Sequence, residues 1–477
     1  MFDIRNIDWG NDSAEHDPNL LNYFITPLNF DRVSNFKKTF VIGRKGSGKT
    51  AIRKKLFNQF SSSNKHFVIE ITPTNSIFRS LSTAQLMNDS TSNDIIFQYA
   101  WLDNIMRKSL NVVGSNVSNT LTMGSLTAAR EFAKQEGFSN LDLFESVTKL
   151  VKDLKLKLPI ADSEFGVNLE SLVKQASCID QYEFHLINLA KDGLHITILV
   201  DDLDVGWDNT ERSNEILLGL LSASMYLKSL HENINLIFFI RDDIYSILMK
   251  KTTHSDKYRD MYKIKWDENS FLNLLAERIN KNISNTNNNA NHSTFNSVFP
   301  EKVGNKYTLG WMFERTLARP RELLQLARLY TESLETNEPS DIVLKDVEDE
   351  YSNWKIQDLC TEFVNQYPHL DKVFDFWKKN YFRTKYQIDE NELNERMKHI
   401  LLNIDISDSW FSELKNKEDM KGLAKILYDI GFFGDFIRGG DGGSQVSYFG
   451  DGSTPLLKEV QIHPCFRKAV GTVERNR

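Results

Sequence analysis

One short stretch of the chain combines phosphate-binding residue types at a fixed spacing. Residues 43–50 read GRKGSGKT, which satisfies the phosphate-loop pattern GxxxxGK[ST]. Its glycines let consecutive backbone N–H groups wrap phosphate oxygens, and the helix N-terminus that follows adds partial positive charge. We expect Lys49 to bridge the β- and γ-phosphates and the Thr50 hydroxyl to take one position on Mg²⁺. The predicted ligands are therefore ATP and Mg²⁺, and the predicted binding residues are Gly43, Arg44, Lys45, Gly46, Ser47, Gly48, Lys49, Thr50 and Ala51.

A phosphate loop needs an acid for the metal and a group that orients water, and residues 195–204 (HITILVDDLD) supply candidates for both. The apolar run ends at Val200, so Asp201 is expected at the carboxyl edge of a strand, where it can hold the Mg²⁺ shell. Asp202 is the candidate that polarises the attacking water. Asp is shorter than the Glu of many ATPases, which predicts slow turnover and favours a switch over a motor. Asp204 is expected to support the turn.

Three further arginines are candidates for sensing the nucleotide. Arg241 ends the apolar run 235–240 and is predicted either to lie near the γ-phosphate or to pair with one of the two aspartates that follow it. Arg319 and Arg321 flank Pro320 at the start of a helical pattern. A lid helix that presents an arginine to the phosphates would couple nucleotide state to lid angle, and Arg321 is the predicted sensor.

The segment around the loop is strongly basic, because no acidic residue occurs between Arg32 and Ile69. This bias favours polyanions nearby. Arg53 to Lys55 are interpreted either as one solvated helix face or as a nucleic-acid contact.

The elements that position these residues follow from hydrophobic patterning. Short apolar runs separated by helical patterns indicate a parallel sheet covered on both faces. The fold class is therefore α/β. Strands are predicted at 38–42, 66–71, 195–200, 235–240 and 262–266.

The domain prediction has three parts. Residues 1–265 form a P-loop core with a helical insertion at about 77–190, which includes a small hairpin at 154–170. Residues 266–335 form a helical lid, which contains an Asn-rich surface loop at 284–293. Residues 336–477 form a helical region whose Gly-rich hairpin suggests a winged helix.

Composition excludes several classes. The 477 residues are 40% hydrophobic and 26% charged with a net charge of −7, as in an ordinary globular protein. The three cysteines form no CxxC or Cys/His run, which argues against a zinc site or disulfide framework. The acidic, polar start and the short apolar runs predict a cytoplasmic protein with no membrane partner.

With these segments in place, the chain resembles the additional-strand branch of P-loop ATPases, in particular the STAND and KAP groups and origin-recognition AAA+ proteins. The motifs GRKGSGKT, VDDLDVGW, FIRDDIY and RPRELLQ, with DPNLLNYFITP and YSNWKIQDL, together resemble a bacterial family of orphan P-loop ATPases found in anti-phage defence loci. The resemblance spans residues 8–360 and implies a sheet in the order 5-1-4-3-2, a helical lid and a C-terminal winged helix. Asp202 departs from the Glu that AAA+ proteins place there.

Three functions remain open. The first is a regulatory ATPase switch in defence, forming a homo-oligomer and licensing a separate effector protein, since no second catalytic motif is present. The second is an origin-recognition type of DNA-binding loader that reads DNA through residues 421–477. The third is a nucleotide-stabilised scaffold without turnover. A neighbouring subunit could add an arginine finger, and the candidates are Arg212 and Arg315.

Overall fold

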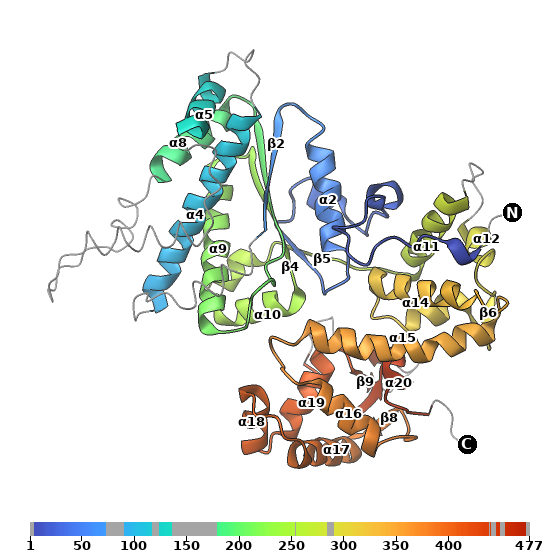
Figure 1. Cartoon of the computed structure of the whole chain (residues 1–477). Helices are drawn as coiled ribbons and strands as arrows, with labels where there is room; N and C mark the ends of the chain where they lie inside the picture. Colours follow the sequence, from blue (N-terminus) through green and yellow to red (C-terminus); the bar gives the residue numbers. More distant parts are fainter. Residues whose placement is uncertain are drawn as a thin grey trace. The chain divides into compact units, whose positions relative to one another are not determined.

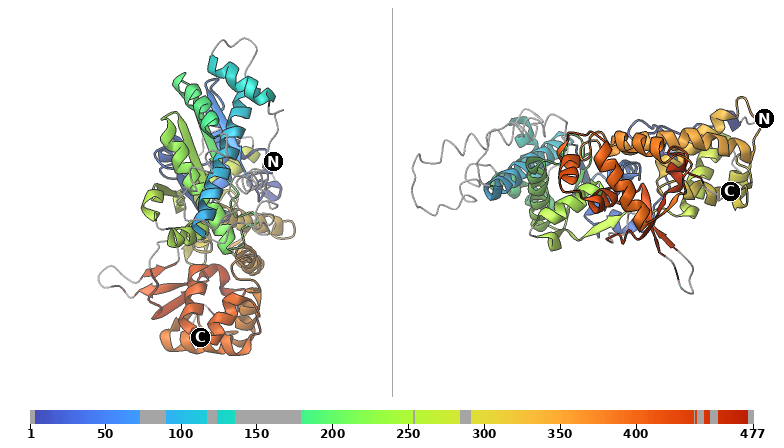
Figure 2. Two further views of the ribbon diagram at one scale, coloured as in Figure 1. Left: turned by 90° about the vertical axis from the view of Figure 1, so that its left-hand side faces the viewer. Right: turned by 90° about the horizontal axis from the view of Figure 1, so that it is seen from below.

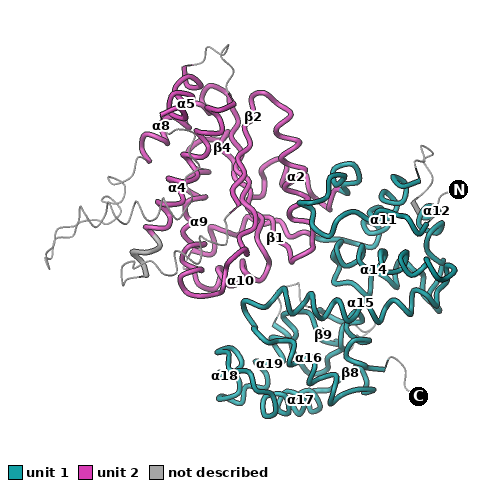
Figure 3. The backbone as a smooth tube through the Cα atoms, viewed as in Figure 1, with its two compact units in different colours: residues 1–25, 265–477 teal, residues 26–264 magenta. Residues whose placement is uncertain are grey.

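The computed structural model describes residues 4–72, 90–116, 124–135, 179–252, 254–283, 291–437, 439, 445–448 and 454–473. The chain divides into two compact units (Figure 3). Unit 2 consists of residues 26–264, and unit 1 combines residues 1–25 with residues 265–477. The end of unit 2 at Ile264 is close to the boundary expected at 265. The expected lid and C-terminal regions belong to the same unit.

A five-stranded parallel sheet forms the centre of unit 2 (Figure 1). Its order is β2-β3-β4-β1-β5, which confirms the expected order 5-1-4-3-2 and the α/β fold class. Strand β4 therefore separates β1, which leads into the phosphate loop, from β3, which leads into the acidic residues. The strands are β1 Phe40–Ile42, β2 His66–Ile71, β3 His195–Val200, β4 Ile234–Ile240 and β5 Met261–Lys263.

Helices cover both faces of this sheet, which is why its strands read as nearly continuous apolar runs. Helix α2 lies on one face, whereas α4 and α9 lie on the other (Figure 1). The central strands β1, β3 and β4 are almost wholly buried between these layers. The helices of unit 2 are α1 Asp31–Ser34, α2 Lys49–Phe60, α4 Ser90–Ser115, α5 Gly124–Gln135, α8 Ile179–Lys191, α9 Glu211–Leu230, α10 Asp242–Lys251 and the 3-10 helix η3 Ser255–Tyr258.

Helices α4, α5 and α8 come from the segment between β2 and β3, where the helical insertion was expected. They pack on one another, and α4 packs along α9 with Phe97, Trp101 and Ile105 fully buried. The Trp101 indole N–H donates to the carbonyl of Ile216 at 2.9 Å, which fixes α4 against α9. The hairpin predicted at 154–170 lies outside the described residues.

The amino end of the sheet carries a histidine that stays neutral in the folded protein. The His66 ring stacks on Phe60 at 4.8 Å, and its Nε2 lies 2.7 Å from the Thr197 hydroxyl. Burial and the neighbouring His195 lower the pKa of His66 to about 4. The unfolded chain binds this proton near pH 6.5, so the folded state loses stability as the pH falls from about 6.5 to about 4.

We expect His66→Gln to reduce this loss by about 1–2 kcal/mol, a value discounted because the ring is half-exposed. Urea unfolding at pH 7.5 and pH 5 measures it. The exposed His254 provides a matched control as His254→Gln. An equal pH dependence in the His66 variant and in the unaltered chain would contradict the assignment.

Unit 1 begins with the N-terminal residues, which pack on its helices. The Trp9 indole N–H donates to the Thr331 hydroxyl at 2.9 Å, and Arg278 lies over the Tyr23 ring at 4.1 Å while donating to the Trp9 carbonyl at 3.1 Å. Residues 1–25 were expected in the P-loop core. The structure instead groups them with unit 1, because Ile7, Trp9 and their neighbours join its apolar core.

Two antiparallel sheets and a run of helices make up the rest of unit 1. Its elements are η1 Ile4–Asn6, η2 Leu20–Tyr23, α11 Glu268–Ile283, α12 Asn291–Asn296, β6 Lys302–Val303, β7 Lys306–Tyr307, α13 Thr308–Glu314, α14 Pro320–Ser333, α15 Asp341–Glu362, α16 Asp371–Asn380, β8 Gln387–Asp389, α17 Glu390–Asn403, α18 Ser409–Asn416, α19 Met420–Asp429, β9 Phe433–Ile437, β10 Gln445–Ser447, β11 Glu459–Ile462 and α20 Pro464–Arg467.

The C-terminal sheet has the order β10-β9-β11-β8. Strands β9 and β10 pair antiparallel at the place of the expected Gly-rich hairpin, and they project from the surrounding helices in Figure 2. The long helix α15 is tied to this part of the chain, because the Ser352 hydroxyl donates to the Cys465 carbonyl at 2.7 Å. Among the described helices, none is both long and apolar enough to cross a membrane.

Candidate phosphate-loop site

The loop between β1 and α2 has the backbone of a phosphate cradle. Gly46 and Gly48 take φ values of 78° and 99°, a region that glycine enters without strain. At Gly43, a Cβ atom would overlap with the Ser47 side chain, which would have to move to admit a larger residue. Gly48 is the N-cap of α2 and no side chain caps that end. The first N–H groups of α2 thus lie where backbone donors bind phosphate in such loops.

The Lys49 ammonium folds back over the loop. Its Nζ donates to the carbonyls of Gly43 at 3.0 Å and Arg44 at 3.2 Å. Arg44 and Lys45 are only partly exposed, and Ser47 is buried inside the turn. The positively charged Lys49 ammonium therefore lies against the glycine-rich loop.

Thr50 and Asp201 meet although they are 151 positions apart in the sequence. The Thr50 hydroxyl donates to Asp201 Oδ2 at 3.2 Å, and the Asp201 backbone N–H extends the sheet by donating to Ile71 at 3.0 Å. Asp201 is 1% exposed. A hydroxyl and a carboxylate beside a lysine are hard oxygen donors of the kind that Mg²⁺ takes in P-loop sites. The residues present therefore fit Mg²⁺.

Sequence reasoning missed one residue of this cluster. Arg53 Nε donates to Asp201 Oδ2 at 3.0 Å, and its NH1 group pairs with Glu70 on β2. Arg53 is buried, so the interpretation of residues 53–55 as one solvated face or a nucleic-acid contact is wrong for Arg53. The sequence spacing could have indicated this contact, because Arg53 follows Thr50 by three positions and so lies on the same side of α2.

These charges set the protonation of the buried acid. Burial raises the pKa of Asp201, while the positive charges of Lys49 and Arg53 and the N–H of Asp202 oppose that rise. For Arg53, burial works against the charge, but Asp201 and Glu70 outweigh it and raise the pKa of the guanidinium. The cluster thus contains one buried cation, Arg53, and one partly exposed cation, Lys49, around one buried carboxylate.

Asp202 adopts a left-handed conformation with φ of 58°. Among residues other than glycine, Asp and Asn tolerate this region best. Asp202 is partly exposed, whereas Asp201 is buried. The two neighbouring acids therefore have different surroundings, and their separate roles stay a prediction.

Arg241 at the end of β4 is held by carboxylates. Its Nε and NH2 groups donate to Asp243 at 3.0 and 2.7 Å, and NH1 lies 3.6 Å from Asp204 Oδ2. Of the two predicted alternatives, this geometry matches the ion pair with a following aspartate. The contact with Asp204 also connects β4 to the turn after Asp202, so Arg241 remains at the carboxyl edge of the sheet beside the candidate site.

Arg321 and Arg319 belong to unit 1, whereas the phosphate loop belongs to unit 2. Arg319 is buried and pairs with Glu362 at 2.7 Å and Glu322 at 3.4 Å. Arg321 retains 25% side-chain exposure and lies 3.3 Å from Asp358. Only Arg321 of this pair has surface available to an external phosphate, which agrees with its choice over Arg319. Its role as a sensor stays a prediction.

The two candidates for an arginine finger differ in the same way. Arg315 is buried, pairs with Glu348 at 2.5 Å and lies over the Trp311 ring at 4.0 Å. Arg212 retains 24% side-chain exposure and pairs with Glu215 at 3.2 Å. Arg212 is therefore the more accessible of the two.

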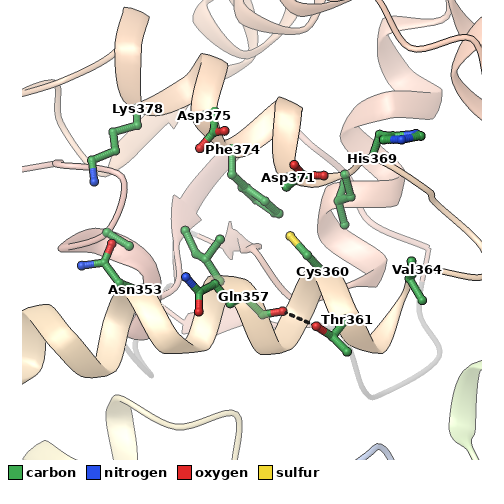
Figure 4. Close-up of a pocket in the computed structure, with 13 residues that line it drawn as sticks. Asn353, Gln357, Cys360, Thr361, Val364, His369, Asp371, Phe374, Asp375 and Lys378 are labelled. Carbon is green, nitrogen blue, oxygen red and sulfur yellow. Dashed lines mark hydrogen bonds between the residues drawn. The ribbon is translucent and has the colours of Figure 1, made fainter.

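A separate pocket of about 490 Å³ lies between α15 and α16 in unit 1 (Figure 4). Its lining includes Cys360 from α15 and Phe374 from α16. Burial, reinforced by Asp371 and Asp375, raises the pKa of the Cys360 thiol to about 12. The thiol is therefore protonated at neutral pH and is not an activated nucleophile.

The sheet order and the loop that follows its first strand define the fold of P-loop ATPases. Residues 269–360 match the family described as the FunZ-associated C-terminal helical domain. The putative transposon gamma-delta 80.3 kDa protein of Escherichia coli (strain K12) is 23% identical over 492 aligned positions, which cover 96% of this chain. The chain spans 66% of the length of that relative.

Solved structures to which this chain is similar include the Walker-type ATPase paby2304 of Pyrococcus abyssi, at a TM-score of 0.39 and 11% identity, covering 98% of this chain and 99% of that one. The Aeropyrum pernix ORC1 protein in complex with DNA has a TM-score of 0.36 and 12% identity, with 94% and 93% covered. At these scores neither structure supports a conclusion about the activity of this chain.

Proposed function

We propose that this chain is a P-loop ATPase that binds ATP with Mg²⁺, hydrolyses it slowly and acts as a molecular switch. The observation that supports this most is the meeting of three groups: the Lys49 ammonium over the glycine loop, the Thr50 hydroxyl, and the buried Asp201 carboxylate 3.2 Å from that hydroxyl. A turn without a ligand has no need for this convergence of a lysine, a hydroxyl and a strand-end acid.

Each residue has a separate task in this proposal. The glycine loop and the α2 N-terminus donate N–H groups to phosphate oxygens, and Lys49 places a positive charge beside them. Thr50 and Asp201 hold Mg²⁺, which neutralises charge on the phosphates when bound. Asp202 orients a water and accepts its proton. Arg241 keeps the Asp204 turn, and thereby Asp202, at the carboxyl edge of β3.

We expect Asp202→Asn to retain ATP binding and to lower the rate of phosphate release by about 10²-fold or more, the typical contribution of a general base. Asn suits the left-handed backbone of this position and has a similar shape, so the fold is preserved. Calorimetry measures binding, and a phosphate-release assay measures turnover. Asp256→Asn, the same change at an exposed position of the same unit, serves as the control. Unchanged turnover in Asp202→Asn would assign the base to another residue.

The finer parts of the proposal are a lid that senses nucleotide through Arg321, a homo-oligomer, and a separate effector protein in a defence system. Their support is the motif resemblance together with the partial exposure of Arg321. Phosphate release measured with and without duplex DNA separates the alternatives. Strong stimulation by DNA would favour a loader, and binding of ATP without turnover would favour a scaffold.

A further inference from the structure

Eight consecutive residues in unit 1, from the last turn of α16 into the connection to β8, form an unusually basic surface segment. Residues 378–385 read KKNYFRTK and contain four cations and no acid. This segment, termed the basic loop, is distinct from the P-loop site and from residues 421–477. Its exposed members are Lys378, Lys379, Asn380, Phe382, Arg383 and Lys385.

Within the part of the chain that the structure describes, the cations of the basic loop do not pair with carboxylates. Across the described residues, Lys378, Lys379, Arg383 and Lys385 form no salt bridge with a carboxylate. Other exposed lysines of this unit do so, as Lys425 does with Asp429. The position of Lys378 and Lys379 in the last turn of α16 is explained by the helix dipole. That explanation does not extend to Arg383 or Lys385.

An aromatic ring is exposed among these charges. Phe382 is 56% exposed, although a large apolar side chain is more stable when buried. The Arg383 guanidinium lies 5.4 Å from the centre of this ring. A flat exposed ring beside cations is the arrangement with which proteins stack unpaired bases while they bind the adjoining phosphates.

Hydrogen bonds and packing contacts fix the conformation of the basic loop. Arg383 holds a left-handed φ of 61° and donates its N–H to the Gly471 carbonyl at 2.7 Å. Gly471 leaves room for Phe382, since a Cβ at that position would overlap with the ring. The Val473 N–H donates to the Thr384 carbonyl at 3.0 Å, and the Tyr381 hydroxyl lies 2.9 Å from His399 Nδ1. Strained backbone held in this way is found where function fixes a loop.

From these observations we infer that the basic loop is a binding platform for single-stranded nucleic acid, with an unpaired base on Phe382 and the phosphates beside Arg383 and Lys385. A single strand fits better than a duplex, because paired bases do not offer their faces to a ring on the surface. The inference does not depend on ATP binding by unit 2. It therefore extends beyond the proposed switch.

The test uses the full chain, a fluorescent 20-nucleotide DNA strand and anisotropy between 50 and 200 mM salt. Arg383→Gln/Lys385→Gln is expected to weaken binding and to reduce the salt slope by about one to two units, since each phosphate contact contributes about 0.7 for a single strand. Lys345→Gln/Lys417→Gln removes the same charge from exposed positions on the same unit and is expected to leave binding unchanged. Equal losses in both double variants would overturn the assignment.

The ring is tested separately. Phe382→Leu retains apolar packing against Gly471 but lacks a flat π face, so it is expected to weaken binding about fivefold or more, whereas Phe382→Trp retains binding. Circular dichroism confirms that each variant is folded. Two results would contradict the inference: affinity for inorganic polyphosphate equal to that for DNA, or a duplex bound as tightly as the strand with no effect of Phe382→Leu. Lys49→Ala is expected to bind the strand normally, which keeps this test independent of the ATP site.

Discussion

Lys49→Ala is expected to reduce the affinity for ATP about a hundredfold or more. The Lys49 ammonium lies over the carbonyls of Gly43 and Arg44 at the centre of the loop. Its loss removes charge-assisted hydrogen bonds to phosphate, and about 3 kcal/mol corresponds to slightly more than a hundredfold in the dissociation constant. Isothermal titration calorimetry with ATP and Mg²⁺ measures the change.

Lys65→Ala provides the control for this experiment, because Lys65 is an exposed lysine in the same unit. It removes one positive charge without altering the loop and is expected to bind ATP as the unaltered chain does. Normal binding by Lys49→Ala would remove the basis of the P-loop assignment. Weakened binding in both variants would point to general electrostatic attraction instead of a defined site.

Arg53→Met is expected to lower the free energy of unfolding of unit 2 by about 3 kcal/mol. Asp201 is 1% exposed, and Arg53 is the cation that donates to it directly, at 3.0 Å. Removal of one partner of a buried ion pair leaves an uncompensated charge in a poorly solvated position. Calorimetric unfolding of the full chain measures the loss, and the transition that ATP shifts identifies unit 2.

A double-mutant cycle with Asp201→Asn tests the cause of this destabilisation. When the carboxylate is already neutral, Arg53→Met should have a smaller effect, with a coupling energy of about 1–3 kcal/mol. Glu70→Gln is the matched comparison, because Glu70 also pairs with Arg53 but its side chain is 35% exposed, so its loss should matter less. Additive effects of the Arg53 and Asp201 changes would show that Asp201 does not depend on Arg53.

Arg53 and Arg241 show that sequence patterns do not identify the ion-pair partners of a charged residue. Both arginines were recognised as cations near the expected nucleotide, but their carboxylate partners depend on the path of other chain segments. Arg53 contacts Asp201, which lies 148 positions away, and Arg241 contacts Asp204 from the neighbouring strand. To predict such pairings, one must know which strands are neighbours in the sheet and how closely a helix approaches them.

The N-terminal residues illustrate the same limit at a larger scale. Residues 1–25 precede the first strand in the sequence, which favoured their assignment to the P-loop core. They nevertheless bury Ile7 and Trp9 with helices that lie beyond residue 265. Local apolar content predicts that such a segment packs somewhere, but it does not identify its partner.

The sequence by itself determined the α/β class, the approximate positions of the five parallel strands and the glycine loop, because short apolar runs and a glycine spacing are local patterns that dictate backbone conformation. The order of the strands was implied by the family resemblance, and the structure confirms it. Only the tertiary structure decided that Arg53 and Thr50 both contact Asp201 and that Arg241 pairs with Asp243 and Asp204. It also decided that the Phe382 ring of the basic loop packs against Gly471. The physical reason is that hydrogen bonds, ion pairs and close packing act over a few ångströms of space, whereas the residues that form these contacts are up to 151 positions apart along the chain.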